Sequence, residues 1–160
     1  MSTPDVVVHE AGAGDVAAIA SLRRLWSAGG EEPGFEGRMG AWLAAEGDRR
    51  TTWLAVRAGR PVGLASLFEY RRMPHPARPD SRWGYVGNIF VCEDVRDWGI
   101  GSALLAALIA AADERGYARL VLSPTVRARE FYRRAGFIVP DEEAGDDHLL
   151  VRPGPPAAQL

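Results

Sequence analysis

The chain contains no lysine, a single cysteine and no long hydrophobic run. Cys92 has no partner for a disulfide within the chain and lies in an apolar stretch, which is typical of a protein from a reducing compartment. No stretch reaches the roughly 20 apolar residues that a membrane-spanning helix needs. The opening segment, MSTPDVVVHE, lacks the basic and long apolar parts of a signal peptide. We therefore expect a soluble, cytoplasmic protein.

Excess positive charge is also absent. The 160 residues carry 19 basic and 21 acidic side chains, for a formal net charge of −2. Because nonspecific binding to nucleic acids and anionic membranes is driven by positive charge, we expect neither as a partner. Hydrophobic residues make up 47% and charged residues 25% of the chain, which excludes a disordered, collagen-like or coiled-coil protein. The length predicts one domain, residues 1–160, with 153–160 as a frayed tail.

The order of apolar patterns and turn formers predicts an α+β fold. Helices are expected from residue 16 to about 26 and over 35–45, 99–115 and 126–135. Ala58 and Gly59 predict a hairpin turn, and three prolines make residues 71–83 a stiff connection. The acidic segment 141–147 is expected to form a solvated hairpin tip. The strands are expected at 6–8, 51–57, 61–70, 85–92, 118–122, 137–139 and 148–151, with 85–92 central because it is apolar on both faces.

The most informative segment is the strand around residues 88–91 together with residues 96–102, which open the most apolar helix. Glycines at 99 and 101 allow a ligand to approach the backbone, and the start of a helix favours an anion such as pyrophosphate. Two known phosphate motifs fail on spacing, because Leu104 stands where a dinucleotide fingerprint needs glycine and no Gly-Lys-Ser/Thr sequence occurs. A tight strand-to-helix turn without a ligand explains the glycines equally well.

This segment contains the first of two sequence motifs. The first is Arg96-x-x-Gly99-x-Gly101, and the second is Thr125-x-x-Ala128-x-x-Phe131-Tyr132-x-x-x-Gly136-Phe137. Their sequence and separation resemble the GNAT superfamily of acetyl-CoA-dependent N-acetyltransferases, and the order of elements matches from residue 6 to 151. The resemblance implies a mixed, mostly antiparallel central sheet flanked by helices, with strands splayed at the cofactor site.

The resemblance also implies the site residues. Acetyl-CoA is the expected co-substrate, and no metal is expected, because the three histidines lack ligand spacing. Tyr132 and Asn88 are the catalytic candidates. The residues expected to bind acetyl-CoA are Phe90, Val91, Arg96, Asp97, Trp98, Gly99, Ile100, Gly101, Ser102, Thr125 and Ala128.

The chain departs from the family pattern at four positions. Asp97 places a carboxylate beside the expected pyrophosphate site, so its side chain must point to solvent or pair with an arginine. Trp98 is bulkier than the usual residue, and Thr125 replaces a common asparagine. Gly87 stands where many relatives carry a glutamate that acts as general base. A base or a chain of waters is still needed, because an alkylamine with a pKa of about 10.4 is mostly protonated at pH 7.

Each candidate side chain has a structural alternative. The phenol of Tyr132 remains protonated at pH 7 and suits a general acid for the leaving thiolate, or it is a core residue beside Phe131. Asn88 either positions a water or packs in the strand. Glu69 is a distant candidate base or an exposed carboxylate, and Cys92 fits a small core residue better than a nucleophile.

The expected activity is direct transfer of acetyl from acetyl-CoA to a primary amine on a small molecule or peptide. The alternative is a non-catalytic acyl-CoA sensor or interaction module on the same fold. Four arginines in the proline-rich connection either recognise a carboxylate or phosphate on the acceptor or form a solvated charged run: Arg71, Arg72, Arg78 and Arg82. Family resemblance is also compatible with a homodimer.

Overall fold

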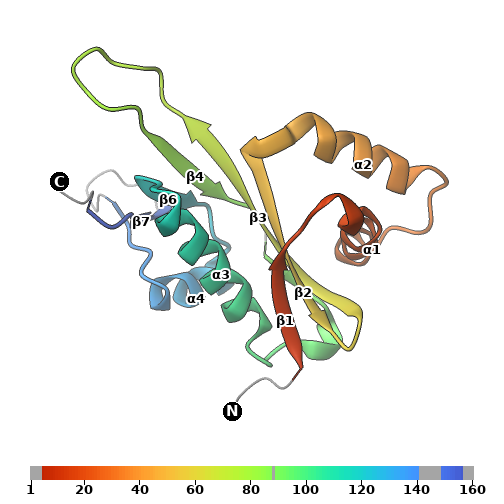
Figure 1. The fold of residues 1–160 in the computed structure, drawn as a ribbon. Helices are drawn as coiled ribbons and strands as arrows, with labels where there is room; N and C mark the ends of the chain where they lie inside the picture. Colours follow the sequence, from red (N-terminus) through yellow and green to blue (C-terminus); the bar gives the residue numbers. More distant parts are fainter. Residues whose placement is uncertain (1–4, 88, 141–148, 157–160) are drawn as a thin grey trace. The chain divides into compact units, whose positions relative to one another are not determined.

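A computed structural model describes residues 5–87, 89–140 and 149–156 (Figure 1). Asn88 and the acidic segment 141–147 lie outside the described residues. The seven strands form a mixed, mostly antiparallel sheet. The chain forms two compact units, one within Met1–Ser66 and Asn88–Leu108 and the other within Leu67–Gly87 and Ile109–Leu160. Strand β3 (Arg60–Arg71) and helix α3 (Ile100–Glu114) contribute residues to both units.

In the first unit, β1 (Val6–Glu10) pairs antiparallel with β2 (Arg50–Arg57). A turn at Ala58 and Gly59, with φ of 49° and 77°, connects β2 to β3. Positive φ at both central residues is the geometry of a two-residue hairpin, so this predicted turn is confirmed. The short strand β5 (Phe90–Val91) pairs antiparallel with β3.

Two helices of the first unit follow β1 in sequence. Helix α1 (Val16–Ser27) buries Ile19, Ala20 and Leu22, the side that the apolar spacing predicts. Helix α2 (Phe35–Glu46) buries no residue completely. Three single-turn 3₁₀ helices also belong to this unit: η1 (Ala13–Asp15), η2 (Gly47–Arg49) and η3 (Glu93–Val95).

In the second unit, β4 (Arg82–Val86) pairs antiparallel with the end of β3 and parallel with β6 (Arg119–Leu122). Strand β7 (Leu150–Pro153) pairs antiparallel with β6. The 3₁₀ turn η4 (Val126–Ala128) leads into helix α4 (Arg129–Arg134). The N–H of Gly154 donates to the carbonyl of Ala118, which continues the pairing beyond Pro153.

Close packing in the second unit depends on the glycine of β4. A Cβ added at Gly84 would lie 2.6 Å from Cδ1 of Leu67 and 2.9 Å from Cδ2 of Leu120. Leu67 and Leu120 are both fully buried, so this position has no room for a larger residue.

The expected single strand over 85–92 is wrong, because the chain divides there into β4 and β5. Val86 pairs with Leu67, and Phe90 pairs with Leu64. Two residues of β3 separate Leu64 from Leu67, whereas three residues of the sequence separate Val86 from Phe90. The register of β5 on β3 is therefore shifted by one residue from the register of β4.

Three other expectations are corrected at their boundaries. The expected strand 137–139 is a single bridge, in which Ile138 and Val151 exchange two backbone hydrogen bonds of 2.8 Å. The expected connection 71–83 is shorter, because β3 extends to Arg71 and β4 begins at Arg82. The expected helix 126–135 starts as the 3₁₀ turn η4.

A substitution in helix α3 measures how much the core contributes to the free energy of unfolding. Leu108 is 0% exposed, so Leu108→Ala should lower the free energy of unfolding by about 2–5 kcal/mol through lost burial and the cavity left behind. Leu25 on α1 is 59% exposed, and Leu25→Ala should change stability by less than about 0.5 kcal/mol. Urea denaturation measures both. Equal losses in the two variants would contradict the placement of Leu108 in the core.

Candidate functional site

The turn before α3 has an unusual backbone. Asp97 and Gly99 both have positive φ, at 69° and 79°. Glycine adopts this conformation without steric cost, and aspartate tolerates it better than most residues. The side chain of Arg96 turns back toward β5, where its Nε donates to the carbonyl of Val91 at 3.2 Å.

The first turn of α3 presents unpaired backbone donors. The N–H of Ala103 donates to the carbonyl of Gly99 at 3.0 Å, so the N–H groups of Ile100, Gly101 and Ser102 have no acceptor within the helix. Ile100 is buried and anchors this turn. Free N–H groups and the positive end of the helix dipole attract an anion. This geometry fits the pyrophosphate site predicted for residues 96–102, which we call the cradle.

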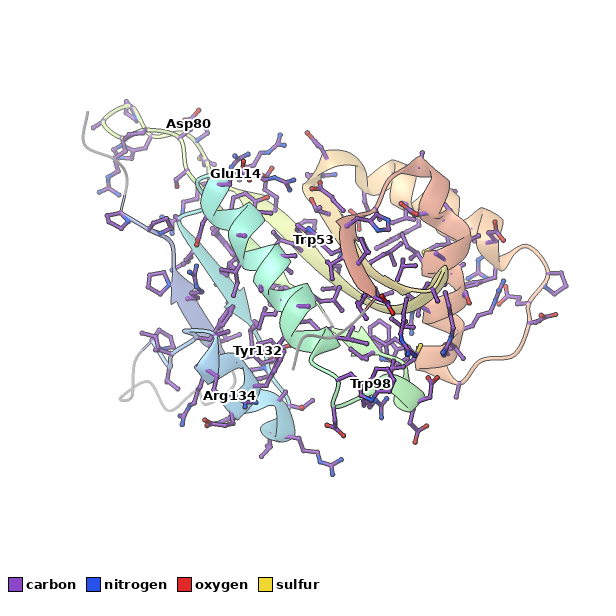
Figure 2. All side chains as sticks on the ribbon, turned by 60° about the horizontal axis from the view of Figure 1, so that its bottom comes forward. Trp53, Asp80, Trp98, Glu114, Tyr132 and Arg134 are labelled. Carbon is purple, nitrogen blue, oxygen red and sulfur yellow. The ribbon has the colours of Figure 1, made fainter. Side chains whose placement is uncertain are left out.

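Charged and aromatic side chains hold the loop in place. Trp98 is 44% exposed (Figure 2), and the guanidinium of Arg57 lies 4.4 Å from the centre of its ring. Arg60 makes a two-pronged pair with Asp94 at 2.8 and 3.0 Å, and this hydrogen bonding lowers the pKa of that carboxyl. Asp97 is exposed, so its carboxylate is free of the burial that would oppose its charge.

A contact that sequence analysis missed joins α1 to β5. The rings of Trp26 and Phe90 stack with centroids 6.2 Å apart, and Arg23 lies 4.5 Å from the centre of the Trp26 ring. The helix pattern predicted from residue 16 to about 26 carries no information about this partner. Trp26 therefore supports the β5 residue that is expected to lie beside the acetyl group.

The second motif lies in the other unit. The carbonyl of Thr125 accepts a hydrogen bond from the N–H of Ala128 at 3.0 Å, and this pairing starts η4. Tyr132 is 8% exposed, and its ring makes edge contacts with Phe131 and Phe137. Burial raises the pKa of the Tyr132 phenol, so the hydroxyl keeps its proton at neutral pH. The Tyr132 side chain is therefore packed against its neighbours and still keeps a proton that it can donate.

Glu69 is not the exposed carboxylate that the sequence suggests, because it is 4% exposed. Its two oxygens accept from Arg71 Nε at 2.7 Å and Arg82 Nη1 at 2.9 Å. Burial opposes its charge, but hydrogen bonds from Arg71 and Tyr117 and the positive charge of Arg82 outweigh burial and lower the pKa of Glu69. Such a carboxylate is a weak base, which argues against the role of general base.

Tyr117 also belongs to the cluster that Glu69 forms with Arg71 and Arg82. Burial and the hydrogen bond to Glu69 raise the pKa of Tyr117 to about 12. The guanidinium of Arg82 lies 5.1 Å from the centre of its ring. Glu69 and Tyr117 are thus buried, whereas the side chains of Arg71 and Arg82 remain partly exposed. Nothing in the sequence pattern indicates that these four residues meet.

Neither Cys92 nor the metal-ligating side chains form a second functional site among the described residues. Cys92 is buried, and burial raises the pKa of its thiol, which suits a core residue. Within residues 5–87, 89–140 and 149–156, no group of three metal-ligating side chains gathers. In the same part of the chain, the helices are too short or too polar to cross a bilayer.

The predicted site residues divide between the two units. Phe90, Val91 and residues 96–102 come together in the first unit, around β5 and the start of α3. Thr125, Ala128 and Tyr132 come together in the second, around η4 and α4. The catalytic candidate Asn88 lies outside the described residues.

Comparison with known proteins shows which family and which solved structures resemble this chain. The sequence profile of the acetyltransferase (GNAT) family matches residues 16–137. Among solved structures, a GNAT-family acetyltransferase from Streptococcus pneumoniae superposes with a TM-score of 0.73 at 19% identity, over 94% of this chain and 100% of that one. A predicted acetyltransferase from Clostridium acetobutylicum, solved with acetyl-CoA, gives 0.67 at 21%, over 86% and 92%.

A third structure, a GNAT-family acetyltransferase from Brucella melitensis in complex with acetyl-CoA, gives a TM-score of 0.67 at 18% identity, over 94% of this chain and 89% of that one. The comparison with curated proteins gave no significant match. The solved structures agree with the α+β fold and with the mostly antiparallel sheet that the sequence predicts.

The Glu69 cluster predicts a pH-dependent contribution to stability. Glu69→Gln should lower the free energy of unfolding at pH 7 by about 1–3 kcal/mol, because two charge-assisted hydrogen bonds are lost. The folded-state pKa of Glu69 is lowered, so its contribution is complete above the ordinary glutamate value of 4.5 and is lost as pH falls through the folded value. The gap between wild type and variant should therefore close below about pH 4.5.

Urea denaturation from pH 7 to pH 3 checks this, with Asp94→Asn as the control. Asp94 also pairs with an arginine but is 58% exposed, so that variant should differ little from wild type at pH 7. A gap for Glu69→Gln that stays constant with pH would show that packing, and not charge, explains the loss.

Proposed function

Because the chain belongs to the acetyltransferase (GNAT) family, we propose that it transfers the acetyl group of acetyl-CoA directly to a primary amine, with residues 1–160 acting as one catalytic domain. The observation that supports this most is the start of α3, where three backbone N–H groups lack an acceptor within the helix. A location in the cytoplasm and a homodimer are parts of the same proposal.

Acetyl-CoA supplies the activated acyl group, a thioester whose thiolate leaves. In our proposal, the backbone of residues 96–102 binds its pyrophosphate through the N–H groups at the start of α3. Arg96, already turned toward β5, adds positive charge beside them. Phe90 and Val91 offer backbone groups to the acetyl and pantetheine parts, and Thr125 and Ala128 complete the pantetheine side.

Tyr132 acts as the general acid in this proposal. Its phenol keeps its proton, because burial raises its pKa, and the aromatic contacts of Phe131 and Phe137 fix its ring. Donation from its Oη to the leaving sulfur avoids the release of a free thiolate. Asn88 is proposed to position a water.

The amine must lose a proton before or during attack. Gly87 offers no side chain for this step, and Glu69 is held by two arginines with a lowered pKa. We therefore propose that water, positioned by Asn88, removes the proton. The acceptor is a small-molecule or peptide amine, and a thiol-release assay across amines, polyamines, amino acids and peptide N-termini tests both activity and acceptor class.

The cradle predicts a selective loss of cofactor binding. Gly101→Glu adds bulk and negative charge among the free N–H groups, so acetyl-CoA affinity should fall by at least about tenfold while the fold survives. Calorimetry with acetyl-CoA measures the affinity, and circular dichroism checks the fold. Gly37→Glu adds the same side chain on exposed α2 with nothing within 4 Å of its Cβ, and it should bind acetyl-CoA like wild type. Unchanged affinity in a folded Gly101→Glu protein would contradict the proposal that the start of α3 binds the pyrophosphate.

The acid role predicts a specific loss of turnover. Tyr132→Phe keeps the ring and its packing but removes the hydroxyl, so kcat should fall by roughly 10²–10⁴-fold while acetyl-CoA still binds. Tyr70→Phe, at a half-exposed position, should keep full turnover. Full turnover in Tyr132→Phe would return this residue to a packing role, and equal losses of binding and turnover would mean that the hydroxyl anchors the cofactor.

A further inference from the structure

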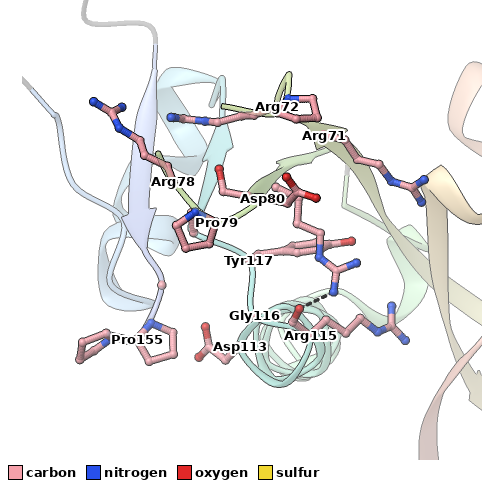
Figure 3. Close-up of a pocket in the computed structure, with 16 residues that line it drawn as sticks. Arg71, Arg72, Arg78, Pro79, Asp80, Asp113, Arg115, Gly116, Tyr117 and Pro155 are labelled. Carbon is pink, nitrogen blue, oxygen red and sulfur yellow. Dashed lines mark hydrogen bonds between the residues drawn. The ribbon is translucent and has the colours of Figure 1, made fainter. Parts of the chain in front are cut away.

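A large pocket opens in the second unit at the C-terminal end of α3 (Figure 3). Its volume is 1340 Å³, and its walls come from the β3–β4 connection, the segment from Asp113 to Ala118, and residues 154–156. The proposed pyrophosphate cradle belongs to the other, N-terminal end of α3. The pocket and the cradle therefore use different residues of that helix.

The pocket concentrates positive charge. Five arginines and two aspartates line it, an excess of three positive charges in a chain with a net charge of −2. In Figure 3, the side chains of Arg72 and Arg78 extend to one side of the pocket, and those of Arg71 and Arg115 extend to the other. Tyr117 and Pro79 add apolar surface between them.

Internal pairs account for part of this charge. Glu69 holds Arg71 and Arg82, and Arg82 also donates to the carbonyl of Arg115. Asp113 is neutralised by Arg152, which contacts both of its oxygens at 2.9 and 3.1 Å.

Three of the seven charged side chains that line the pocket have no ion pair with another described residue. Within the described part of the chain, the guanidinium groups of Arg72 and Arg78 have no ion pair, and neither does the carboxylate of Asp80. All three are exposed to solvent. Two unpaired arginines against one unpaired aspartate leave the pocket with an uncompensated positive charge.

The connection that carries Arg72 and Arg78 is held in one conformation. The N–H of Arg72 donates to the carbonyl of Ser81 at 3.0 Å, and the N–H of Arg78 donates to the carbonyl of His75 at 3.2 Å. The N–H of Ala77 donates to Nδ1 of His75 at 3.1 Å. Prolines at 74 and 79 restrict the backbone further. A ligand bound here would lose little affinity to ordering this connection.

We propose that this pocket binds a small organic anion with two or more phosphate or carboxylate groups. Arginine forks match the geometry of both groups, and the two arginines without an ion pair, Arg72 and Arg78, can each hold one of them. A single phosphate ion would fill little of a pocket this large, and the apolar surface of Tyr117 and Pro79 suits a carbon skeleton. The anion is either part of the acceptor or a separate effector.

Calorimetry on the full chain tests binding, with citrate and pyrophosphate as probes and saturating CoA present to fill the cofactor site. Removing Arg72 and Arg78 together by alanine substitution should weaken citrate binding by about tenfold or more. Asp80→Asn removes the opposing charge and should strengthen it severalfold. Arg49→Ala, an exposed arginine outside the pocket, should leave it unchanged. Arg71 and Arg82 are kept, because Glu69 needs both partners.

The proposal is overturned if wild type binds neither probe, or if the Arg72/Arg78 variant and Asp80→Asn bind as wild type does. Circular dichroism shows whether the variants are folded. These results do not depend on acetyl transfer, so they stand even if the proposed function fails.

Kinetics then separates the two sources of the anion, and this step does rest on the proposed function. If the anion belongs to the acceptor, the Arg72/Arg78 variant should raise KM for phosphorylated or carboxylated amines and leave KM for neutral amines unchanged. If it is a separate effector, citrate should change kcat or KM for a neutral amine in wild type but not in the variant. Either pattern supports an anion site in the pocket.

Discussion

Backbone pairing along β3 is the constraint on which both units depend. Gly63 and Leu64 pair with β5, whereas residues 67–71 pair with β4, and the partner strand holds one residue more than β3 between these two stretches. β4 and β5 are therefore separate strands, and Gly87 and Ile89 belong to neither of them. β5 is left as a two-residue strand that leads directly into η3 and the turn before α3.

The sequence contains no lysine, and arginine pairs with several carboxylates of the described residues. Glu69, Asp94 and Asp113 each contact one or more guanidinium groups. A guanidinium offers several donors in a fixed plane, so one arginine can hold a carboxylate and a second group together, as Arg82 holds Glu69 and the carbonyl of Arg115.

Tyr132 shows how packing and proposed chemistry share one residue. Aromatic contacts within its own unit fix the ring, and the same burial keeps the phenol protonated. Glu69 shows the opposite result. Its burial is offset by donors that favour the carboxylate, so it holds the ends of β3 and β4 together but has little basicity. The two environments widen the gap that residue type already sets, because one raises the pKa of the phenol and the other lowers the pKa of the carboxyl.

The sequence by itself determined the α+β class, the hairpin at Ala58 and Gly59, the glycine turn before α3 and the membership of both motifs in one family. These features are local, because spacing along the chain and the allowed values of φ define them. The shift of register between β4 and β5 on β3, the stacking of Trp26 on Phe90, the burial of Glu69 beside two arginines and the arginine-lined pocket were decided only by the tertiary structure. Each depends on residues far apart in sequence that meet through strand register or side-chain packing, and periodicity within one element carries no information about its partner.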